Sequence, residues 1–527
     1  MPLNIHPLNC LPLTFRRPNI QNIFLPGLVL SVLCGCGPTG KEQSPVADSA
    51  TFKKENAEEF INQANKDDTI EIIIPTFLGN EKRNYYGNMA PDKLKVIWKT
   101  YLGEGKTTIG DTTITWKGAG WTGQPLMVRE KNKRYLMQGS YDHHLRKIDA
   151  ETGEVIWLYK FDDIIKGTAS LRYDKNQADL KYRLIIYQGS RMGVDLSLWS
   201  KQAPSFRAIS YFTGEEVWRH NVSKTRSYSR DVDGSGLLVN DTLYIGFENG
   251  LFTKMEAGIK NITSKDGHHF PKVFSQHKLF TKKDIYLHKG NLVTESSPAL
   301  LNDRIYITAG SGHVYGYNIE NDSIEWDFYI GSDLDGSPVV TEDSCILIAV
   351  EKQYIKGKGG VLKLDPSKKP ENAVVWYKPV EDKETPSWQG GVIGSPGTNE
   401  QTRPEGFPRL VASSSIDGHL YVFSQNEVKT DDQGRPVTVR GFDDKTYFNT
   451  PVEVFRYYMG PSISTPIFVN NKLIVGGYNG LYLFEYDKTG AFTLLDRFGA
   501  TFEATPIAID KKLFVASRNG YLYCFGD

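Results

Sequence analysis

The sequence predicts an all-β protein, an eight-bladed β-propeller of four-stranded antiparallel blades. Aromatic residues make up 12% of its 527 residues and 49 residues are glycine, which suits many short strands joined by tight turns. A sequence pattern recurs along the chain: a small polar residue and usually a proline, then an apolar strand and a turn. A strand ending in tryptophan follows most copies of this pattern. Four strand signals per unit, repeated about every 54 residues, indicate a propeller rather than a solenoid.

The recurring phrase is clearest in four copies, and weaker copies bring the total to eight. Each copy holds three strand signals separated by turn residues such as Asn302-Asp303 and Asn479-Gly480, which tolerate positive φ. We therefore interpret residues 71–527 as one propeller domain. The clearest copies are "SSPALLNDRIYITAGSGHVYGYN" (296–318), "GSPVVTEDSCILIAV" (336–350), "STPIFVNNKLIVGGYNGLYLFE" (464–485) and "ATPIAIDKKLFVASRNGYLYCF" (504–525).

The predicted fourth strand of a blade ends in a large aromatic residue. In "IDAETGEVIW" (148–157), Thr152 and Gly153 form the turn before this strand, and the Asp149 side chain can accept hydrogen bonds from the turn amides. We expect the ring to pack between neighbouring blades, because one blade cannot bury both of its faces alone. The aromatic residues are Trp157, Trp218, Trp326, Trp376 and, as a variant, Phe455.

The last copy ends at its third strand, so the eighth blade lacks a fourth strand of its own. Residues 94–103, "LKVIWKTYLG", carry the same apolar-tryptophan pattern and have no inner strands ahead of them. We predict that this N-terminal strand completes blade eight. Such closure removes the exposed edges that an open sheet must otherwise protect.

We expect the N-terminal segment to be a targeting signal rather than part of the fold. Arg16 and Arg17 precede the apolar run "IFLPGLVLSVL", which is too short to span a bilayer and is typical of an export signal. The following "LCGC" resembles the lipobox of bacterial lipoproteins, with Cys36 as the acylated residue. We expect residues 1–35 to be a lipoprotein signal peptide and residues 36–70 a flexible polar tether. An ordinary secretory signal is the alternative.

This targeting signal predicts that the chain lies in the bacterial cell envelope, where a lipid such as palmitate holds it to a membrane. Gly37 stands where some bacteria use aspartate to retain a lipoprotein at the inner membrane, so we expect the outer membrane, with the leaflet left open. Lys plus Arg equals Asp plus Glu at 62 each, so no whole-chain basic field favours nucleic acid. The expected partners are envelope or outer-membrane proteins.

The tryptophan strands resemble the pyrroloquinoline-quinone (PQQ)-like propeller repeat family, whose units carry A-x-D-x-x-T-G-x-x-x-W. "KIDAETGEVIW" departs from this pattern at Lys147, and "AISYFTGEEVW" departs at Ser210. Quinoprotein dehydrogenases of that family use an adjacent cysteine disulfide, a calcium site and an aspartate base. This chain has no adjacent pair of cysteines, and Cys345 and Cys524 are the only ones beyond residue 36. The resemblance therefore points to the cofactor-free lipoprotein branch, the propeller scaffold of the outer-membrane β-barrel assembly machinery, and leaves PQQ and calcium as disfavoured cofactors.

The repeat also aligns side chains around the predicted axis, because residues two apart on a strand share a face. One position before the repeated proline is mostly hydroxyl: Gln124, Thr168, Ser235, Ser297, Ser337, Ser395, Thr465 and Thr505. Three positions before it, several side chains are charged: Thr122, Lys166, Asp233, Glu295, Asp335, Ile393, Ile463 and Glu503. Asp233, Glu295, Asp335, Glu503 and Lys166 form our candidate cation or polar-ligand site at the channel mouth. A solvated rim without a ligand is the alternative.

The sequence favours a non-catalytic, membrane-anchored scaffold. No GxSxG, P-loop or HExxH motif occurs, so we assign no catalytic residue. Two alternatives stay open: an envelope enzyme, either carbohydrate-active or a divergent quinoprotein, and a glycan or small-ligand receptor. The insertions at 190–207, with Leu198 and Trp199, and at 257–284, which mixes basic and aromatic residues, are candidate partner surfaces.

Overall fold

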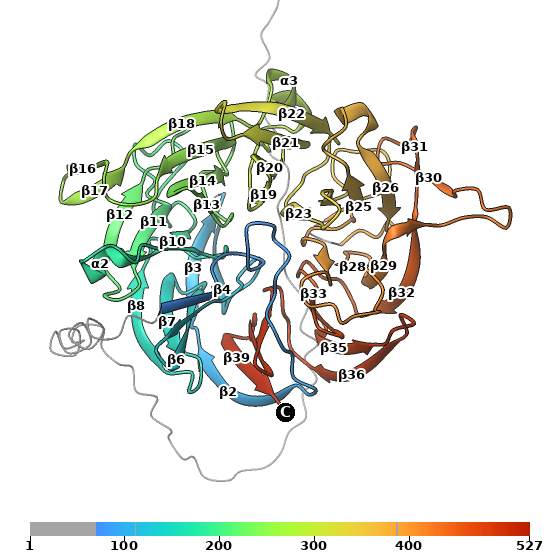
Figure 1. Cartoon of the computed structure of the whole chain (residues 1–527). Helices are drawn as coiled ribbons and strands as arrows, with labels where there is room; N and C mark the ends of the chain where they lie inside the picture. The colour runs from blue at the N-terminus through green and yellow to red at the C-terminus, as the bar shows by residue number, and fades with distance from the viewer. Residues whose placement is uncertain (1–69, 111, 386–387) are drawn as a thin grey trace, which may run out of the picture.

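The computed structural model describes residues 70–110, 112–385 and 388–527. The chain forms eight antiparallel sheets around one axis, which confirms the predicted eight-bladed propeller (Figure 1). The predicted signal peptide, the tether and Cys36 lie outside the described residues. Within the described ranges, no helix has the length and apolar character needed to cross a membrane.

The first four blades follow one another in chain order. Blade 1 contains a fifth strand, β1 (Ile70–Ile74), which pairs with the innermost strand β5. The other strands of blade 1 are β5 (Leu126–Glu130), β6 (Lys133–Gly139), β7 (His144–Asp149) and β8 (Val155–Lys160). Blade 2 contains β9 (Ser170–Tyr173), β10 (Leu184–Gly189), β11 (Phe206–Ser210) and β12 (Glu216–His220). Blade 3 contains β13 (Leu237–Val239), β14 (Thr242–Phe247), β15 (Leu251–Glu256) and β18 (Val273–Lys278). Blade 4 contains β19 (Ala299–Leu301), β20 (Arg304–Ala309), β21 (His313–Asn318) and β22 (Ser323–Tyr329).

The last four blades complete the ring. Blade 5 contains β23 (Val339–Val340), β24 (Ile346–Val350), β25 (Gly360–Leu364) and β26 (Val374–Pro379). Blade 6 contains β27 (Gly397–Thr398), β28 (Leu410–Ser414), β29 (His419–Val428) and β32 (Pro451–Tyr458). Blade 7 contains β33 (Ile467–Val469), β34 (Lys472–Gly477), β35 (Gly480–Tyr486) and β36 (Phe492–Phe498). Blade 8 contains β37 (Ile507–Ile509), β38 (Lys512–Ala516), β39 (Tyr521–Gly526) and the N-terminal β2 (Lys95–Tyr101).

The pairing of β2 with β39 confirms the predicted closure. The two strands are antiparallel, with Tyr101 opposite Tyr521 and Lys95 opposite Gly526. Blade 8 therefore joins the two ends of the propeller, and in Figure 1 the blue strand lies beside the red C-terminal one. This pairing gives blade 8 its fourth strand, so the ring closes without an incomplete blade.

The remaining elements are short and extend from the blades. Three two-stranded ribbons are β3 (Glu104–Ile109) with β4 (Thr112–Lys117), β16 (Ile262–Lys265) with β17 (His268–Pro271), and β30 (Thr438–Arg440) with β31 (Tyr447–Asn449). The helices are α2 (Leu180–Arg183), α3 (Lys282–Leu287) and a 3-10 turn at Pro370–Asn372.

The tryptophan of the fourth strand links four of the eight blades to the next one by a hydrogen bond. Gly153 has a φ of +78°, and Asp149 Oδ1 accepts hydrogen bonds from the amides of Glu151 and Thr152, so the predicted turn is confirmed. Trp157 is buried, and its Nε1 donates to the carbonyl oxygen of Tyr211 in blade 2 at 2.9 Å. The same bond runs from blade 8 to 1, from 4 to 5 and from 5 to 6, through Trp98 to Ala150, Trp326 to Lys368 and Trp376 to Gln425.

The strands connect at two opposite faces because neighbours within a blade are antiparallel. The connections from second to third strand, and from each blade to the next, lie at one face, which we call the loop face. The connections from first to second and from third to fourth strand lie at the other, the turn face. Every fourth strand also contains a register shift against the third, a bulge that increases strand twist at the rim.

Residues 75–90 lie across the first strands of several blades. Phe77 N donates to Ser235 Oγ in blade 3, and Leu78 N donates to Gln124 Oε1 in blade 1. Arg83 is fully buried and donates to the carbonyl oxygen of Pro298 in blade 4. Similar bonds reach blades 5, 6 and 8 through Val340, Thr398 and Ala508. Residues 75–90 therefore cover the propeller axis at the turn face, and we call them the axial segment.

Candidate functional site

The predicted ring of residues around the axis is present because small residues let the blades meet there. A Cβ added to Gly167 would lie 2.1 Å from the carbonyl oxygen of Asp233, and one added to Gly394 would lie 2.7 Å from that of Ile463. Lys166 and Ile393 precede these glycines, so each ring residue contacts the next blade through its neighbour. The eight aligned positions therefore form a closely packed ring.

The hydroxyl positions join the blades by hydrogen bonds. The amide of Ser235 donates to Ser297 Oγ at 2.8 Å, and the amide of Ser297 donates to Ser337 Oγ at 2.8 Å. The same bond continues to Ser395 at 2.9 Å and to Thr465 at 3.1 Å. All of these side chains are buried. The hydroxyls thus act as structural links between blades, a role that the repeat alone did not predict.

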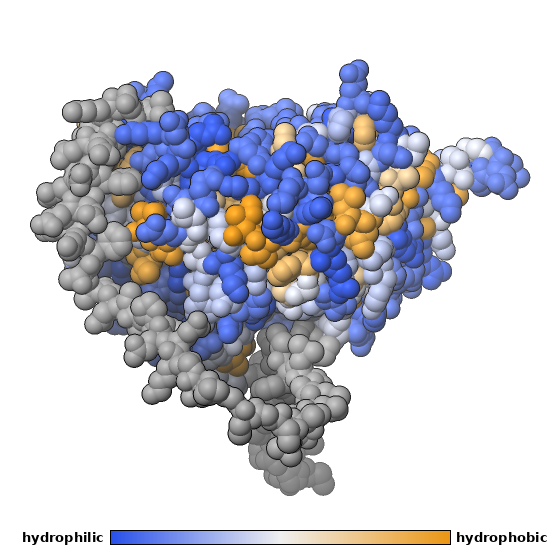
Figure 2. Space-filling view, turned by 90° about the horizontal axis from the view of Figure 1, so that it is seen from below, coloured by the Kyte–Doolittle hydropathy of each residue, from blue (hydrophilic) through white to orange (hydrophobic). Residues whose placement is uncertain are grey.

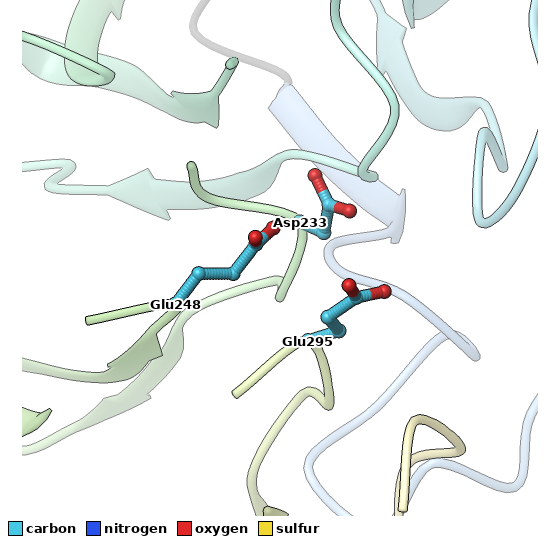
Figure 3. A group of neighbouring side chains, drawn as sticks. All are labelled: Asp233, Glu248 and Glu295. Atoms are coloured by element: carbon cyan, nitrogen blue, oxygen red, sulfur yellow. The ribbon is translucent and has the colours of Figure 1, made fainter. Parts of the chain in front are cut away.

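Three carboxylates from blades 3 and 4 converge near the axis (Figure 3). Asp233 precedes β13, Glu248 follows β14 and Glu295 precedes β19, and one carboxylate oxygen of each lies within 4.8 Å of the others. Asp233 and Glu248 are buried, and Oε1 of Glu248 has no hydrogen-bond partner among the described residues. We call these three residues the first triad.

A second group of three carboxylates lies on blade 5. Asp333 and Asp335 precede β23, Glu351 follows β24, and their oxygens also lie within 4.8 Å of one another. The amide of Asn291 donates to Asp333 Oδ2, whereas Asp333 Oδ1 has no partner in the described part of the chain. We call these residues the second triad, and the two triads together the axial arc.

Two cations balance part of this charge. Lys166 forms an ion pair with Asp233, and Arg191 Nε donates to Asp231 Oδ2 at 2.6 Å. Burial alone would lower the pKa of Lys166, but Asp233 and Glu295 outweigh it and hold the pKa well above its ordinary value. The arc therefore keeps more carboxylates than cations.

The electrostatics of the arc favour protons or a cation. Burial first, opposed by Lys166 and reinforced by Asp233, raises the pKa of Glu295 to about 7. Burial and then Asp233 raise the pKa of Glu248 well above its ordinary value. Burial, Asp333 and Glu295 do the same for the pKa of Asp335, so the two triads influence each other.

Glu503 belongs to the ring but not to the arc. Both of its oxygens accept from Arg518 Nη1, at 2.8 and 3.0 Å, so its charge is neutralised locally. The structure thus brings together four of the five predicted site residues, Asp233, Glu295, Asp335 and Lys166. They are also more deeply enclosed than a channel-mouth rim implies, since the side chain of Asp233 is 0% exposed.

Sequence reasoning missed Glu248, Asp333 and Glu351. The repeat contains a signal for two of them, because Glu248 and Glu351 both directly follow the second strand of their blade. The equivalent residues elsewhere are Ser140, Ser190, Gly310, Ser415, Tyr478 and Ser517. Comparing this position across the blades would have found the two carboxylates. Asp333 lies two residues before Asp335, on the same loop.

The opposite part of the ring is apolar. Trp121, which precedes the ring residue Thr122, packs in one buried cluster with Ile393, Ile416 and Ile463. The axis is therefore chemically divided into an acidic arc on blades 3 to 5 and an apolar group on blades 1, 6 and 7. Carboxylate oxygens in groups of three are ligands for hard divalent cations such as Ca²⁺.

The residues present do not fit a quinone in the manner that the repeat resemblance implies. Cys345 and Cys524 are both buried free thiols, one before β24 of blade 5 and the other in β39 of blade 8. They cannot form the adjacent disulfide that packs against the quinone. The arc consists of carboxyl groups, whereas PQQ is itself a tricarboxylate whose recognition calls for cationic partners. Its donor set fits a divalent cation better than the quinone.

The two predicted partner insertions are placed on blades 2 and 3. Trp199 in the first is 81% exposed, and Leu198 beside it is partly buried. The second includes the ribbon β16–β17, strand β18 and the start of α3.

No protein-family model and no curated protein matches the sequence. Among solved structures, a europium-containing methanol dehydrogenase is similar at 14% identity and TM-score 0.50, over 87% of this chain and 91% of that chain. A quinohemoprotein alcohol dehydrogenase from Comamonas testosteroni is similar at 13% identity and TM-score 0.50, over 86% and 80%. BamB from Moraxella catarrhalis aligns at 12% identity and TM-score 0.47, over 82% and 98%. The chain thus shares the propeller fold of such dehydrogenases, in agreement with the resemblance of its repeats to the PQQ-like family.

Proposed function

We propose that this protein is a lipid-anchored scaffold of the bacterial cell envelope, held at the outer membrane through Cys36, that binds other envelope proteins and is not an enzyme. The lipobox supports the anchor, and the mismatch between the axial residues and a quinone argues against quinoprotein chemistry. The observation that carries the binding role is the surface of the rim, which is formed by the fourth strands.

The fourth strand of each blade is an edge strand, because it pairs only with the third. Six of the eight fourth strands expose large apolar side chains, and those of blades 6, 7, 8 and 1 form a run of four consecutive blades. Figure 2 shows separate hydrophobic patches on this side of the molecule. We call them the rim residues: Tyr458 on β32, Leu494 and Leu495 on β36, Val96, Ile97 and Tyr101 on β2, and Leu158 on β8.

An exposed edge strand with apolar side chains can accept a strand from another protein. Main-chain hydrogen bonds then supply affinity, while alternate side chains supply specificity. The bulges and the lysines of β2 protect these edges against indiscriminate pairing. The partners that fit are strand-rich envelope proteins, including the β-strands of outer-membrane proteins during assembly.

Replacing rim residues tests this proposal. The lipidated protein, purified from its own membranes in mild detergent, is expected to carry stoichiometric envelope or outer-membrane proteins detected by mass spectrometry. Ile97→Asp with Leu495→Asp should reduce their recovery by at least about tenfold, because charges at the centre of an apolar contact cost more than 1.4 kcal/mol.

Phe274→Asp is the matched control for this test. Phe274 is 42% exposed on β18, the fourth strand of blade 3, which lies across the ring from β2 (Figure 1). Its replacement should leave the partners bound. Recovery of the native protein alone, or equal losses in both variants, contradicts the rim as the binding surface.

A second candidate function is binding of a divalent cation by the axial arc. The specific observation is the buried Oε1 of Glu248. This oxygen belongs to the first triad and has no hydrogen-bond partner among the described residues. Binding would stabilise the folded state, because a ligand held only by the folded protein adds about 2.7 kcal/mol at one hundred times its Kd.

Thermal unfolding of the chelator-treated protein tests the cation. Saturating Ca²⁺ should raise the midpoint by about 3 °C. Glu248→Gln with Asp335→Asn should abolish that rise, because each replacement removes a carboxylate ligand oxygen from its triad. Glu503→Gln, in the same ring but paired with Arg518, should keep the response. No shift with Ca²⁺ or Mg²⁺ excludes this function, and quinone absorbance in the native protein would favour an enzyme instead.

A further inference from the structure

One part of the loop face combines exposed aromatic side chains with lysines and arginines. Three connections contribute to it: residues 190–205 within blade 2, residues 221–236 between blades 2 and 3, and residues 279–298 between blades 3 and 4. Trp199 is 81% exposed and Tyr286, on α3, is 83% exposed. We call this the basic aromatic surface, and its members are Trp199, Lys201, Lys224, Arg226, Tyr228, Lys282, Lys283, Tyr286, Leu287 and Lys289.

The three connections lie against one another. The Lys224 ammonium lies over the ring of Trp199, which joins the first connection to the second. The amide of Tyr228 donates to the carbonyl oxygen of Gly290 at 3.1 Å, which joins the second to the third. Arg230 also donates to the carbonyl oxygen of Ser200 at 2.7 Å. The surface is therefore continuous over three neighbouring blades.

The surface carries more positive than negative charge. Its exposed cations are Lys201, Lys224, Arg226, Lys282, Lys283 and Lys289, against the single exposed anion Asp195 in these three connections. None of the six cations forms an ion pair with another described residue. Within α3, the acidic Asp284 is buried and caps the helix through Thr281, so the exposed side of α3 is basic and aromatic.

We propose that the basic aromatic surface docks on the headgroups of an anionic phospholipid membrane. Lysine and arginine are attracted to anionic headgroups, and the amphipathic rings of tryptophan and tyrosine are enriched at the membrane interface. Leu287, 44% exposed beside Tyr286, adds an apolar group next to the ring. A protein partner would need a matching acidic surface, whereas a membrane requires only the charge and the rings that are present.

This inference rests on the proposed lipid anchor, which makes weak docking sufficient. Residues 37–69 separate Cys36 from the first strand. Ile70 pairs with Glu130 beside the turn face, so the tether must pass the rim when the loop face docks. A chain of that length has a relaxed end-to-end distance of about 30 Å and spans about 110 Å when fully extended, which is enough for this path. Tethering also raises the local concentration of the surface at the membrane to about the millimolar range. Docking would hold the rim residues beside the membrane and turn the axial segment away from it.

Vesicle flotation of the mature chain, residues 36–527 with Cys36→Ser, tests the surface without the lipid and without the apolar signal segment. The probes are vesicles of phosphatidylcholine alone and of phosphatidylcholine with phosphatidylglycerol at about three to one. We expect binding to the anionic vesicles only, and loss of it at about 1 M salt, where the Debye length falls to about 3 Å. Lys224→Glu with Lys283→Glu should weaken binding at least about tenfold. Tyr286→Ser with Trp199→Ser should weaken it without changing the charge.

The control variant, Lys133→Glu with Lys488→Glu, makes the same change of charge on exposed turns of the turn face, and it should bind like the parent chain. Equal unfolding midpoints would establish that all variants fold. Equal binding to neutral and anionic vesicles, equal weakening in the control, or no binding at low salt would overturn the proposal. Loss of a co-purifying protein in the Lys224 and Lys283 variant, without vesicle binding by the parent, would instead identify a protein-docking surface. None of these results depends on whether Cys36 is acylated, which mass spectrometry of the native protein tests separately.

Discussion

At the scale of single residues, position within the blade decides what a side chain does. Glu295 and Glu503 occupy the same ring position in blades 4 and 8. Glu295 faces other carboxylates, which together with burial raise its pKa to about 7, whereas Glu503 is paired with Arg518. Identical residues at equivalent positions therefore have different electrostatic surroundings, because the neighbouring blades supply different partners.

The buried His220 should make stability depend on pH. It ends β12, stacks on Phe247 with ring centroids 5.3 Å apart, and burial lowers its pKa to about 4. A group with a lowered pKa in the folded state binds its proton first in the unfolded chain. Its contribution is therefore present above about pH 6.5 and is lost as the pH falls towards 4, by about 3 kcal/mol in total.

Urea unfolding at pH 7 and pH 4.5 measures this contribution. His220→Phe keeps a ring against Phe247 and removes the titrating group, so its free energy of unfolding should fall less between the two pH values than that of the parent. The difference between the two proteins isolates His220 from the carboxylates. Identical pH dependence in both would show that His220 takes up a proton in the folded state.

At the scale of elements, the blades are joined by contacts that recur at fixed positions. In blades 1, 4, 5 and 8 the tryptophan of the fourth strand donates to a carbonyl of the next blade, as Trp157 does to Tyr211. Hydroxyls such as Ser297 accept from the amide of the preceding blade. Glycines such as Gly167 allow the first strands to approach the axis. The repeated sequence pattern thus encodes three separate contacts between blades.

Replacing a glycine of the ring should separate two blades. A Cβ at residue 167 would lie 2.1 Å from the carbonyl oxygen of Asp233, so Gly167→Ala forces the backbone of blade 3 to move. We expect a loss of about 2 kcal/mol in the free energy of unfolding, measured by urea denaturation. Gly499→Ala is the control, because nothing lies within 4 Å of its added Cβ, and it should change stability by less than about 0.5 kcal/mol. Equal stability of the two variants would contradict close packing at the ring.

At the scale of the whole molecule, closure defines two faces and one rim with different chemistry. The turn face holds the axial segment, the loop face holds the basic aromatic surface, and the rim holds the exposed apolar edges. β2 completes the ring by pairing with β39, although more than 400 residues separate them along the chain. If the two proposals hold, a membrane on the loop face and a protein partner on the rim would contact different residues and would not compete.

Most of the fold could be predicted from the sequence because it is local. The turn at Gly153, the alternation within strands and the repeated tryptophan each depend on a few neighbouring residues, and the repeat carries them around the ring. The site could be predicted only in part. Asp233, Glu295 and Asp335 share one repeat position, whereas Glu248 and Asp333 reach them from other positions. Aligning the repeats at one position cannot show which side chains from different repeat positions converge in space.

The sequence by itself determined the propeller, its number of blades, its closing strand and the row of hydroxyl residues near its axis, since each follows from strand periodicity and turn chemistry repeated at constant spacing. Only the tertiary structure decided that Asp233, Glu295 and Asp335 share the axial arc, that Lys166 pairs with Asp233, and that Glu503 is neutralised by Arg518. It also decided that Trp199, Lys224 and Tyr286 lie on one surface. Charge and burial act through space, and the ring places residues from different blades together at distances that their separation in the chain does not reveal.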